Sequence, residues 1–83
     1  MLESKTQKKI RIAHEKDGWL VVKLIQTTMN GIPDLMLLKA GRVVFVEIKR
    51  VGEKPSPLQE YVHSQIRKKG IDVFWTSNPE FHL

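Results

Sequence analysis

The chain has 83 residues, which is enough for one compact domain and too few for two. It has no cysteine, and this excludes disulfide bonds, cysteine-ligated zinc, a thiol nucleophile and an iron–sulfur cluster. The content of 41% hydrophobic and 28% charged residues is typical of a folded domain, and no apolar run approaches the ~20 residues that cross a bilayer. We therefore expect a soluble, cytoplasmic protein with no membrane association.

The charge balance is basic. Fourteen Lys and Arg residues against nine Asp and Glu residues give a formal net charge of +5, and the sequence pI is about 9.8. A basic domain attracts nucleic acid because each neutralised phosphate releases condensed counterions. Surface charge also serves solubility alone, so basicity leaves open both a nucleic-acid binder and a basic surface without such a partner.

The chain alternates between helical and strand patterns. Apolar residues recur every three or four positions up to Gly18, and this spacing predicts a helix. Short runs rich in β-branched and aromatic residues predict strands. Ser56-Pro57-Leu58-Gln59 has the serine cap, the early proline and the glutamine three positions after the cap that open a second helix, which Gly70 ends. In chain order we predict a helix at residues 2–17, strands at 19–25, 32–39 and 42–50, a helix from 56 to 70, and a strand at 71–76.

This order predicts an α/β fold, with a central mixed β-sheet that contains an antiparallel hairpin and is flanked by helices, in a single domain over residues 1–83. Four aromatic residues are expected to fill the core: Trp19, Phe45, Phe74 and Trp75. The histidines show no metal-ligand spacing and are expected to be surface or packing residues: His14, His63 and His82.

The predicted hairpin brings two acidic residues face to face. If residues 40 and 41 form a two-residue turn, the numbers of each cross-strand pair sum to 81, which places Asp34 opposite Glu47. The same register pairs apolar residues with one another, such as Leu35 with Val46. A slip of one residue would turn each matched face away from its partner, so the pattern favours this register.

Two opposed carboxylates need compensation. Side chains of directly opposed residues lie ~5 Å apart, and two negative charges at that distance repel by about 3 kcal/mol at an effective dielectric constant of about 20. A divalent cation such as Mg²⁺ or Mn²⁺ would convert this repulsion into attraction, and Lys49 lies on the same face as Glu47, within reach of a water on the ion. The alternative is a salt bridge between Lys49 and Glu47, with no ion bound and Asp34 simply opening a strand.

These residues form a recognisable pattern. Gly31-Ile32-Pro33-Asp34, followed after twelve residues by Glu47-Ile48-Lys49, resembles the signature of PD-(D/E)xK nucleases. The wider string also includes Glu3, Gly41 and the helix start at Ser56-Pro57-Leu58-Gln59, and it resembles the VRR-NUC family of virus-type replication-repair nucleases. The similarity runs from Glu3 to about Trp75. It implies a small restriction-endonuclease-like domain.

The resemblance implies a role for each site residue. Asp34 and Glu47 would bind Mg²⁺ or Mn²⁺, together with the backbone carbonyl of Ile48. Lys49 would orient or deprotonate the attacking water and offset charge on the scissile phosphate. Glu3 would be a metal-site carboxylate or its hydrogen-bonding partner, although a glutamate in the first turn also stabilises a helix dipole.

Gln59 and the basic residues have two interpretations each. Gln59 would bond the metal-site water or Lys49 according to the resemblance, whereas its position three residues after Ser56 is fully explained by a capping box. The basic side chains are either phosphate contacts or merely solvated. Those expected to contact nucleic acid are Lys5, Lys8, Lys9, Arg50 and Lys54.

The function expected from this pattern is metal-dependent endonucleolytic hydrolysis of DNA phosphodiester bonds, with specificity for structure because no recognition helix is evident. The resemblance further implies branched DNA such as four-way (Holliday) junctions as substrate, a homodimeric state, and a phage or prophage origin with activity in the bacterial cytoplasm. Two alternatives stay open: a DNA-binding or assembly module of the same fold without catalysis, and a metal-independent RNA-binding module.

Overall fold

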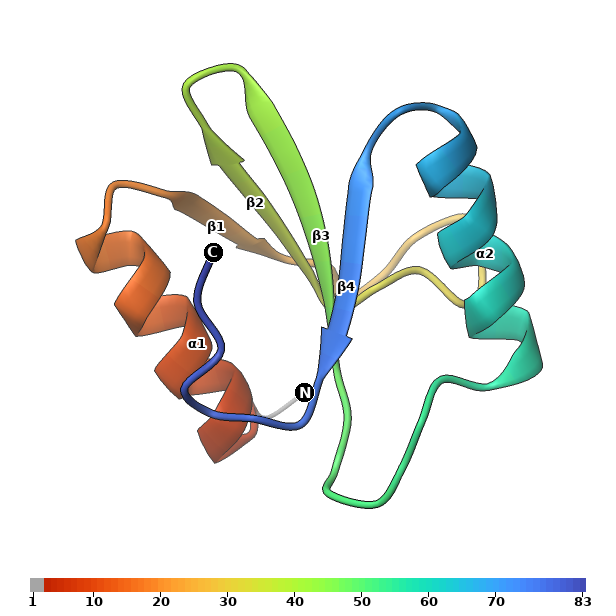
Figure 1. The fold of residues 1–83 in the computed structure, drawn as a ribbon, viewed down its shortest axis with the longest axis horizontal. Helices are drawn as coiled ribbons and strands as arrows, with labels where there is room; N and C mark the ends of the chain where they lie inside the picture. The colour runs from red at the N-terminus through yellow and green to blue at the C-terminus, as the bar shows by residue number, and fades with distance from the viewer. Residues whose placement is uncertain (1–2) are drawn as a thin grey trace.

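A computed structural model describes residues 3–83, and within them the predicted order of helix, three strands, helix and strand is confirmed. The sheet is mixed, and one helix lies on each of its faces (Figure 1). This arrangement confirms the predicted α/β fold. The elements are α1 (Lys5–Lys16), β1 (Leu20–Lys23), β2 (Leu35–Lys39), β3 (Arg42–Ile48), α2 (Pro57–Lys68) and β4 (Asp72–Thr76).

The four strands lie in the order β1-β2-β3-β4. Both β1 and β3 pair antiparallel with β2, whereas β3 and β4 are parallel because the chain returns through α2 before it enters β4. The β2–β3 turn has a positive φ at both Ala40 (50°) and Gly41 (77°), as in the type I′ turns that match the twist of a hairpin. Leu35 pairs with Val46, and every other β2–β3 pair also has numbers that sum to 81, so the predicted register is confirmed.

One face of the sheet packs against α1. The side chain of Ser4 caps this helix by accepting a hydrogen bond from the N–H of Gln7 at 3.1 Å, so α1 begins at Lys5. The predicted start itself lies outside the described residues. The side chains buried between α1 and the sheet form the main hydrophobic core: Ile10, Trp19, Leu35, Leu37, Val44 and Val46.

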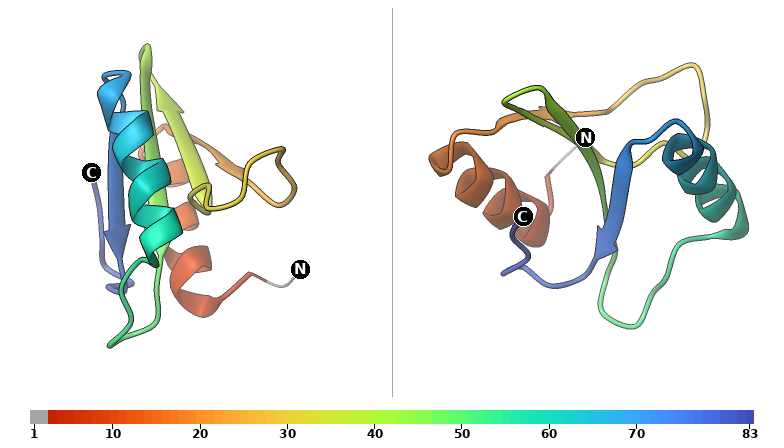
Figure 2. Two further views of the ribbon diagram at one scale, coloured as in Figure 1. Left: turned by 90° about the vertical axis from the view of Figure 1, so that its right-hand side faces the viewer. Right: turned by 45° about the horizontal axis from the view of Figure 1, so that its top comes forward.

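The opposite face packs against α2, as the turned views in Figure 2 show. Val62 and His63 of α2 are buried there. The expectation that Phe74 and Trp75 fill the core is wrong, because they lie on the edge strand β4 and stay 37% and 45% exposed. Within residues 3–83, both helices fall short of the length and apolarity that a membrane crossing requires.

Candidate active site

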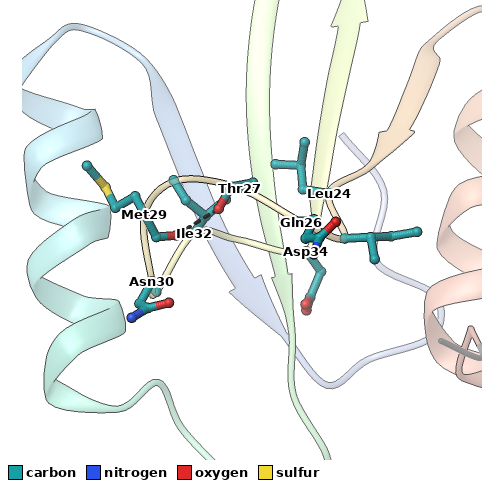
Figure 3. Close-up of a pocket in the computed structure, with 9 residues that line it drawn as sticks. Leu24, Gln26, Thr27, Met29, Asn30, Ile32 and Asp34 are labelled. Carbon is teal, nitrogen blue, oxygen red and sulfur yellow. Dashed lines mark hydrogen bonds between the residues drawn. The ribbon is translucent and has the colours of Figure 1, made fainter.

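The candidate active site forms where β2 begins and β3 ends. β2 starts at Leu35, three residues later than predicted, because Pro33 has no N–H to donate to the ladder. Asp34 therefore lies at the end of the β1–β2 loop, where its backbone carbonyl accepts a hydrogen bond from the N–H of Leu24 at 2.8 Å. Its carboxylate Oδ2 accepts the N–H of Ile48, also at 2.8 Å. Figure 3 shows the Asp34 side chain extending from the loop beside the end of β3.

Glu47 lies opposite Asp34 when the β2–β3 register is continued by one residue, and it is only 3% exposed. Burial, a hydrogen bond with Asp34 and the negative charge of Asp34 together raise the pKa of Glu47 to about 8, and the charge of Lys49 opposes this shift. The Oε1 atom of Glu47 has no hydrogen-bond partner within residues 3–83 and lies 3.7 Å from Nε2 of His63. The predicted pair of acids is therefore brought together, and one of its oxygens is buried and unpaired.

Lys49 directly follows β3. Its backbone N–H donates to the carbonyl of Thr76 at 2.9 Å, which prolongs the β3–β4 ladder by one bond. The half-buried Lys49 lines a pocket together with Asp34, and the pocket extends to the first turn of α1, where Gln7 is 7% exposed. Gln7 was not a predicted site residue. Its signal in the sequence is its place three residues before the apolar Ile10, on the face of the helix that meets the sheet.

The donor set at this site suits a hard divalent cation. The predicted ligands Asp34, Glu47 and Ile48 are adjacent, and carboxylate and carbonyl oxygens are the ligands that Mg²⁺ and Mn²⁺ prefer. A cation would hold Glu47 ionised despite its burial and would engage its carboxylate. In the part of the chain that the structure describes, no three Asp, Glu or His side chains surround a common point, so water and backbone would complete the coordination shell.

Known proteins share both this sequence and this fold. The chain is 37% identical over 59 residues to "Putative nuclease p44" of Acyrthosiphon pisum secondary endosymbiont phage 1, a match that covers 70% of the chain and 63% of the length of the phage protein. It also matches a solved structure described as a VRR_NUC domain, with a TM-score of 0.77, 37% identity, and coverage of 88% of this chain and 84% of that one. The chain belongs to the VRR-NUC family. No family model matches the sequence.

In this VRR-NUC domain, Glu3 does not converge with the two central acids. The Arg11 guanidinium holds its carboxylate in a two-pronged ion pair, with distances of 2.8 Å from Nε to Oε2 and 3.1 Å from Nη2 to Oε1. The hydrogen bond with Arg11 keeps the pKa of Glu3 below its usual value. The role of Glu3 as a metal ligand stays a prediction, because the ion pair would have to open first.

Gln59 forms the capping box that its position predicted. Its side-chain Oε1 accepts the N–H of Ser56 at 2.9 Å, and its own N–H donates to Oγ of Ser56 at 3.2 Å. Its amide Nε2 forms no hydrogen bond within residues 3–83, so this group is available to a ligand. A catalytic contribution of Gln59 therefore stays a prediction. The residue one helical turn further on is His63, which was expected to be a surface or packing residue. It is buried, and its Nε2 lies 3.7 Å from Oε1 of Glu47.

The basic side chains predicted to contact nucleic acid differ in whether they already form ion pairs. Lys9 pairs with Glu80 at 2.8 Å, and Arg50 lies 3.8 Å from Glu53, both on the surface. Such exposed pairs are worth little and open readily for a phosphate. Three further lysines are exposed and form no ion pair among the described residues: Lys5, Lys8 and Lys54.

Proposed function

We propose that this VRR-NUC domain is a divalent-metal-dependent endodeoxyribonuclease. The observation that carries the proposal is the placement of Asp34 against Glu47. Lys49 follows Glu47 by two residues and lines the same pocket as Asp34. The name of the phage relative supports a nuclease, and that relative is longer than the chain. We propose that residues 1–83 form one nuclease domain.

The proposed reaction is hydrolysis of a phosphodiester. A water oxygen attacks phosphorus, the bond from phosphorus to the leaving sugar oxygen breaks, and that oxygen takes up a proton. Asp34, Glu47 and the carbonyl of Ile48 would hold Mg²⁺ or Mn²⁺, and a cation bound there would supply positive charge for the phosphate and make a nearby water easier to deprotonate. Lys49 would orient or deprotonate the attacking water and offset the charge that develops on the phosphate.

We propose branched DNA as the substrate class, as the resemblance to the VRR-NUC family implies. The net charge of +5 favours phosphate contacts that carry no sequence information, and both helices pack on the sheet in place of projecting into a groove. A homodimer would supply the two sites that symmetric cleavage of a four-way junction needs, because each chain has one. The phage relative supports action in the cytoplasm of a bacterial host.

The ion pair between Glu3 and Arg11 favours a second candidate. If Glu3 is a required ligand, its capture by Arg11 leaves a catalytically inactive DNA-binding or assembly module of the same fold. The two candidates differ in their dependence on metal, because DNA binding through basic side chains needs none.

A substrate panel separates them. Single-stranded, duplex, flap and four-way-junction DNA are incubated with the protein in Mg²⁺, Mn²⁺ or EDTA, beside the Glu47→Gln variant. The nuclease proposal expects cleavage with metal, none in EDTA, and loss of cleavage with retained DNA binding in Glu47→Gln. Metal-independent binding without cleavage of any substrate would favour the inactive module.

A further inference from the structure

Two buried polar atoms face each other between the sheet and α2. Within residues 3–83, Oε1 of Glu47 and Nε2 of His63 are the buried side-chain nitrogen and oxygen atoms that have no hydrogen-bond partner. They lie 3.7 Å apart, and the side chains are 4% and 2% exposed. Buried polar atoms are nearly always hydrogen-bonded, so a facing pair that is left unpaired calls for a functional explanation.

The helix cap of α2 and the packing of α2 against the rest of the fold fix the position of His63. The capping box at Ser56 sets where α2 begins, and Val62 beside His63 packs on the sheet side of the helix. The β1–β2 loop also closes on α2: a Cβ added at Gly31 would meet Val62 at 3.1 Å and Leu58 at 3.2 Å. This contact places α2 against the loop that ends in Asp34. The imidazole is therefore held relative to both acids at once.

We infer that His63 is a positioning residue for the metal site: its Nε2–H donates to Oε1 of Glu47 and thereby directs Oε2 toward the point shared with Asp34. This inference rests on the proposed function. The present 3.7 Å separation is slightly too long for a hydrogen bond, so the inferred bond requires the two side chains to move closer together. Partners of this kind fix the orientation of a ligand and are worth about 10–100-fold in metal affinity.

The surroundings of His63 suit this role. The residue is 1% exposed, and its Nε2 has no hydrogen-bond partner within residues 3–83. A ring nitrogen that carries a proton offers one N–H to the carboxylate. A mere packing role predicts something different, because leucine has a similar shape and would fill the same space without an unpaired nitrogen.

The test measures Mn²⁺ affinity and metal-free thermal stability, both in the absence of DNA. Isothermal titration with MnCl₂ is run on wild type, Asp34→Ala, His63→Leu and His63→Gln. His14→Leu is the matched control, because His14 is equally buried but has a partner on each ring nitrogen, Ile10 O at 2.7 Å and Leu83 N at 3.1 Å.

His63→Leu is expected to lose about 10–100-fold in Mn²⁺ affinity while its metal-free Tm stays the same or rises. His63→Gln should recover part of the affinity, because its amide N–H replaces the imidazole donor. His14→Leu should show the reverse, a lower Tm with unchanged Mn²⁺ affinity.

The outcomes separate this inference from the proposed function. Absence of Mn²⁺ binding by wild type would defeat both. Binding that is lost in Asp34→Ala but unchanged in His63→Leu would overturn the inference alone. A His63→Leu protein that unfolds without metal would also overturn it, because packing would then explain the histidine.

Discussion

The carboxylate of Asp34 accepts a hydrogen bond from the backbone N–H of Ile48 at 2.8 Å, at the point where the β2–β3 ladder has already ended. A side chain therefore replaces the next backbone acceptor of β2. This bond anchors one oxygen of Asp34 at the neighbour of Glu47 in the chain, which brings the second acid close. The ends of the two central strands that position the acids are thus part of the site itself.

The raised pKa of Glu47 predicts a pH dependence of stability in the metal-free protein. The carboxyl has a pKa of about 8 in the fold and a usual value of 4.5, so the unfolded chain loses its proton first as the pH rises. Its contribution to the free energy of unfolding is full below pH 4.5 and is lost as the pH rises through 8, with a slope of at most about 1.4 kcal/mol per pH unit.

Urea unfolding in EDTA checks this dependence. Between pH 5 and pH 8, Glu47→Gln should gain stability relative to wild type, because the unfolded wild-type chain gains a charged carboxylate over this range and the unfolded variant does not. Parallel stability profiles for the two proteins would show that Glu47 titrates normally in the fold.

Lys49 is expected to act on the water and the phosphate and not on metal binding. Lys49→Met should lower turnover by about 10²–10⁴-fold, the usual range for a general acid or base, and should leave the Kd for Mn²⁺ within a few fold of wild type. Lys39→Met is the control, because Lys39 lies at the far end of the β2–β3 hairpin and pairs with Asp17 at 3.6 Å. Equal turnover in the two variants would remove Lys49 from the reaction.

A single substitution of Gln59 can separate its role in capping α2 from a role in catalysis. Gln59→Glu keeps the side-chain oxygen that accepts the N–H of Ser56 but removes the amide donor. Gln59→Ala loses the capping bond and should be less stable by ~1 kcal/mol. We expect Gln59→Glu to melt at the wild-type temperature and to cleave DNA more slowly. Wild-type turnover in Gln59→Glu would assign Gln59 to the cap alone.

The exposed lysines predict the salt dependence of DNA binding. Lys54 forms no ion pair within residues 3–83, and it lies in the loop that leaves β3. Each phosphate contact contributes about one unit to the slope of log affinity against log salt, so Lys54→Ala should reduce that slope by roughly one. The measurement is fluorescence anisotropy of labelled DNA in EDTA from low to moderate salt. A slope that Lys54→Ala leaves unchanged would remove Lys54 from the interface.

Local patterns predicted the hairpin and its two acids, because strand periodicity and the glycine turn fix the register from neighbouring residues alone. Asp34 and Glu47 were found in this way. His63 was not, because its contact with Glu47 depends on how α2 packs on the sheet, and no short-range spacing encodes that distance. The i,i+4 spacing of Gln59 and His63 was the one available hint that both lie on the same side of the helix.

For Glu3, the sequence did not decide between two possible arrangements. Its role was expected from resemblance, whereas its partner in the structure, Arg11, is eight residues away and two turns along the chain. A glutamate just before a helix and an arginine within that helix belong to one continuous segment, so the sequence allowed both arrangements. Phe74 and Trp75 were expected in the core for their size, and the position of β4 at the edge of the sheet leaves them partly exposed.

We expect Asp34 and Glu47 to bind one divalent cation where β2 begins and β3 ends. Crystals soaked in MnCl₂ and measured at the manganese absorption edge show whether they do. An anomalous peak is expected within coordination distance of both carboxylates and the carbonyl of Ile48, and no such peak in Asp34→Ala. Well-ordered carboxylates with no anomalous peak between them would contradict this expectation.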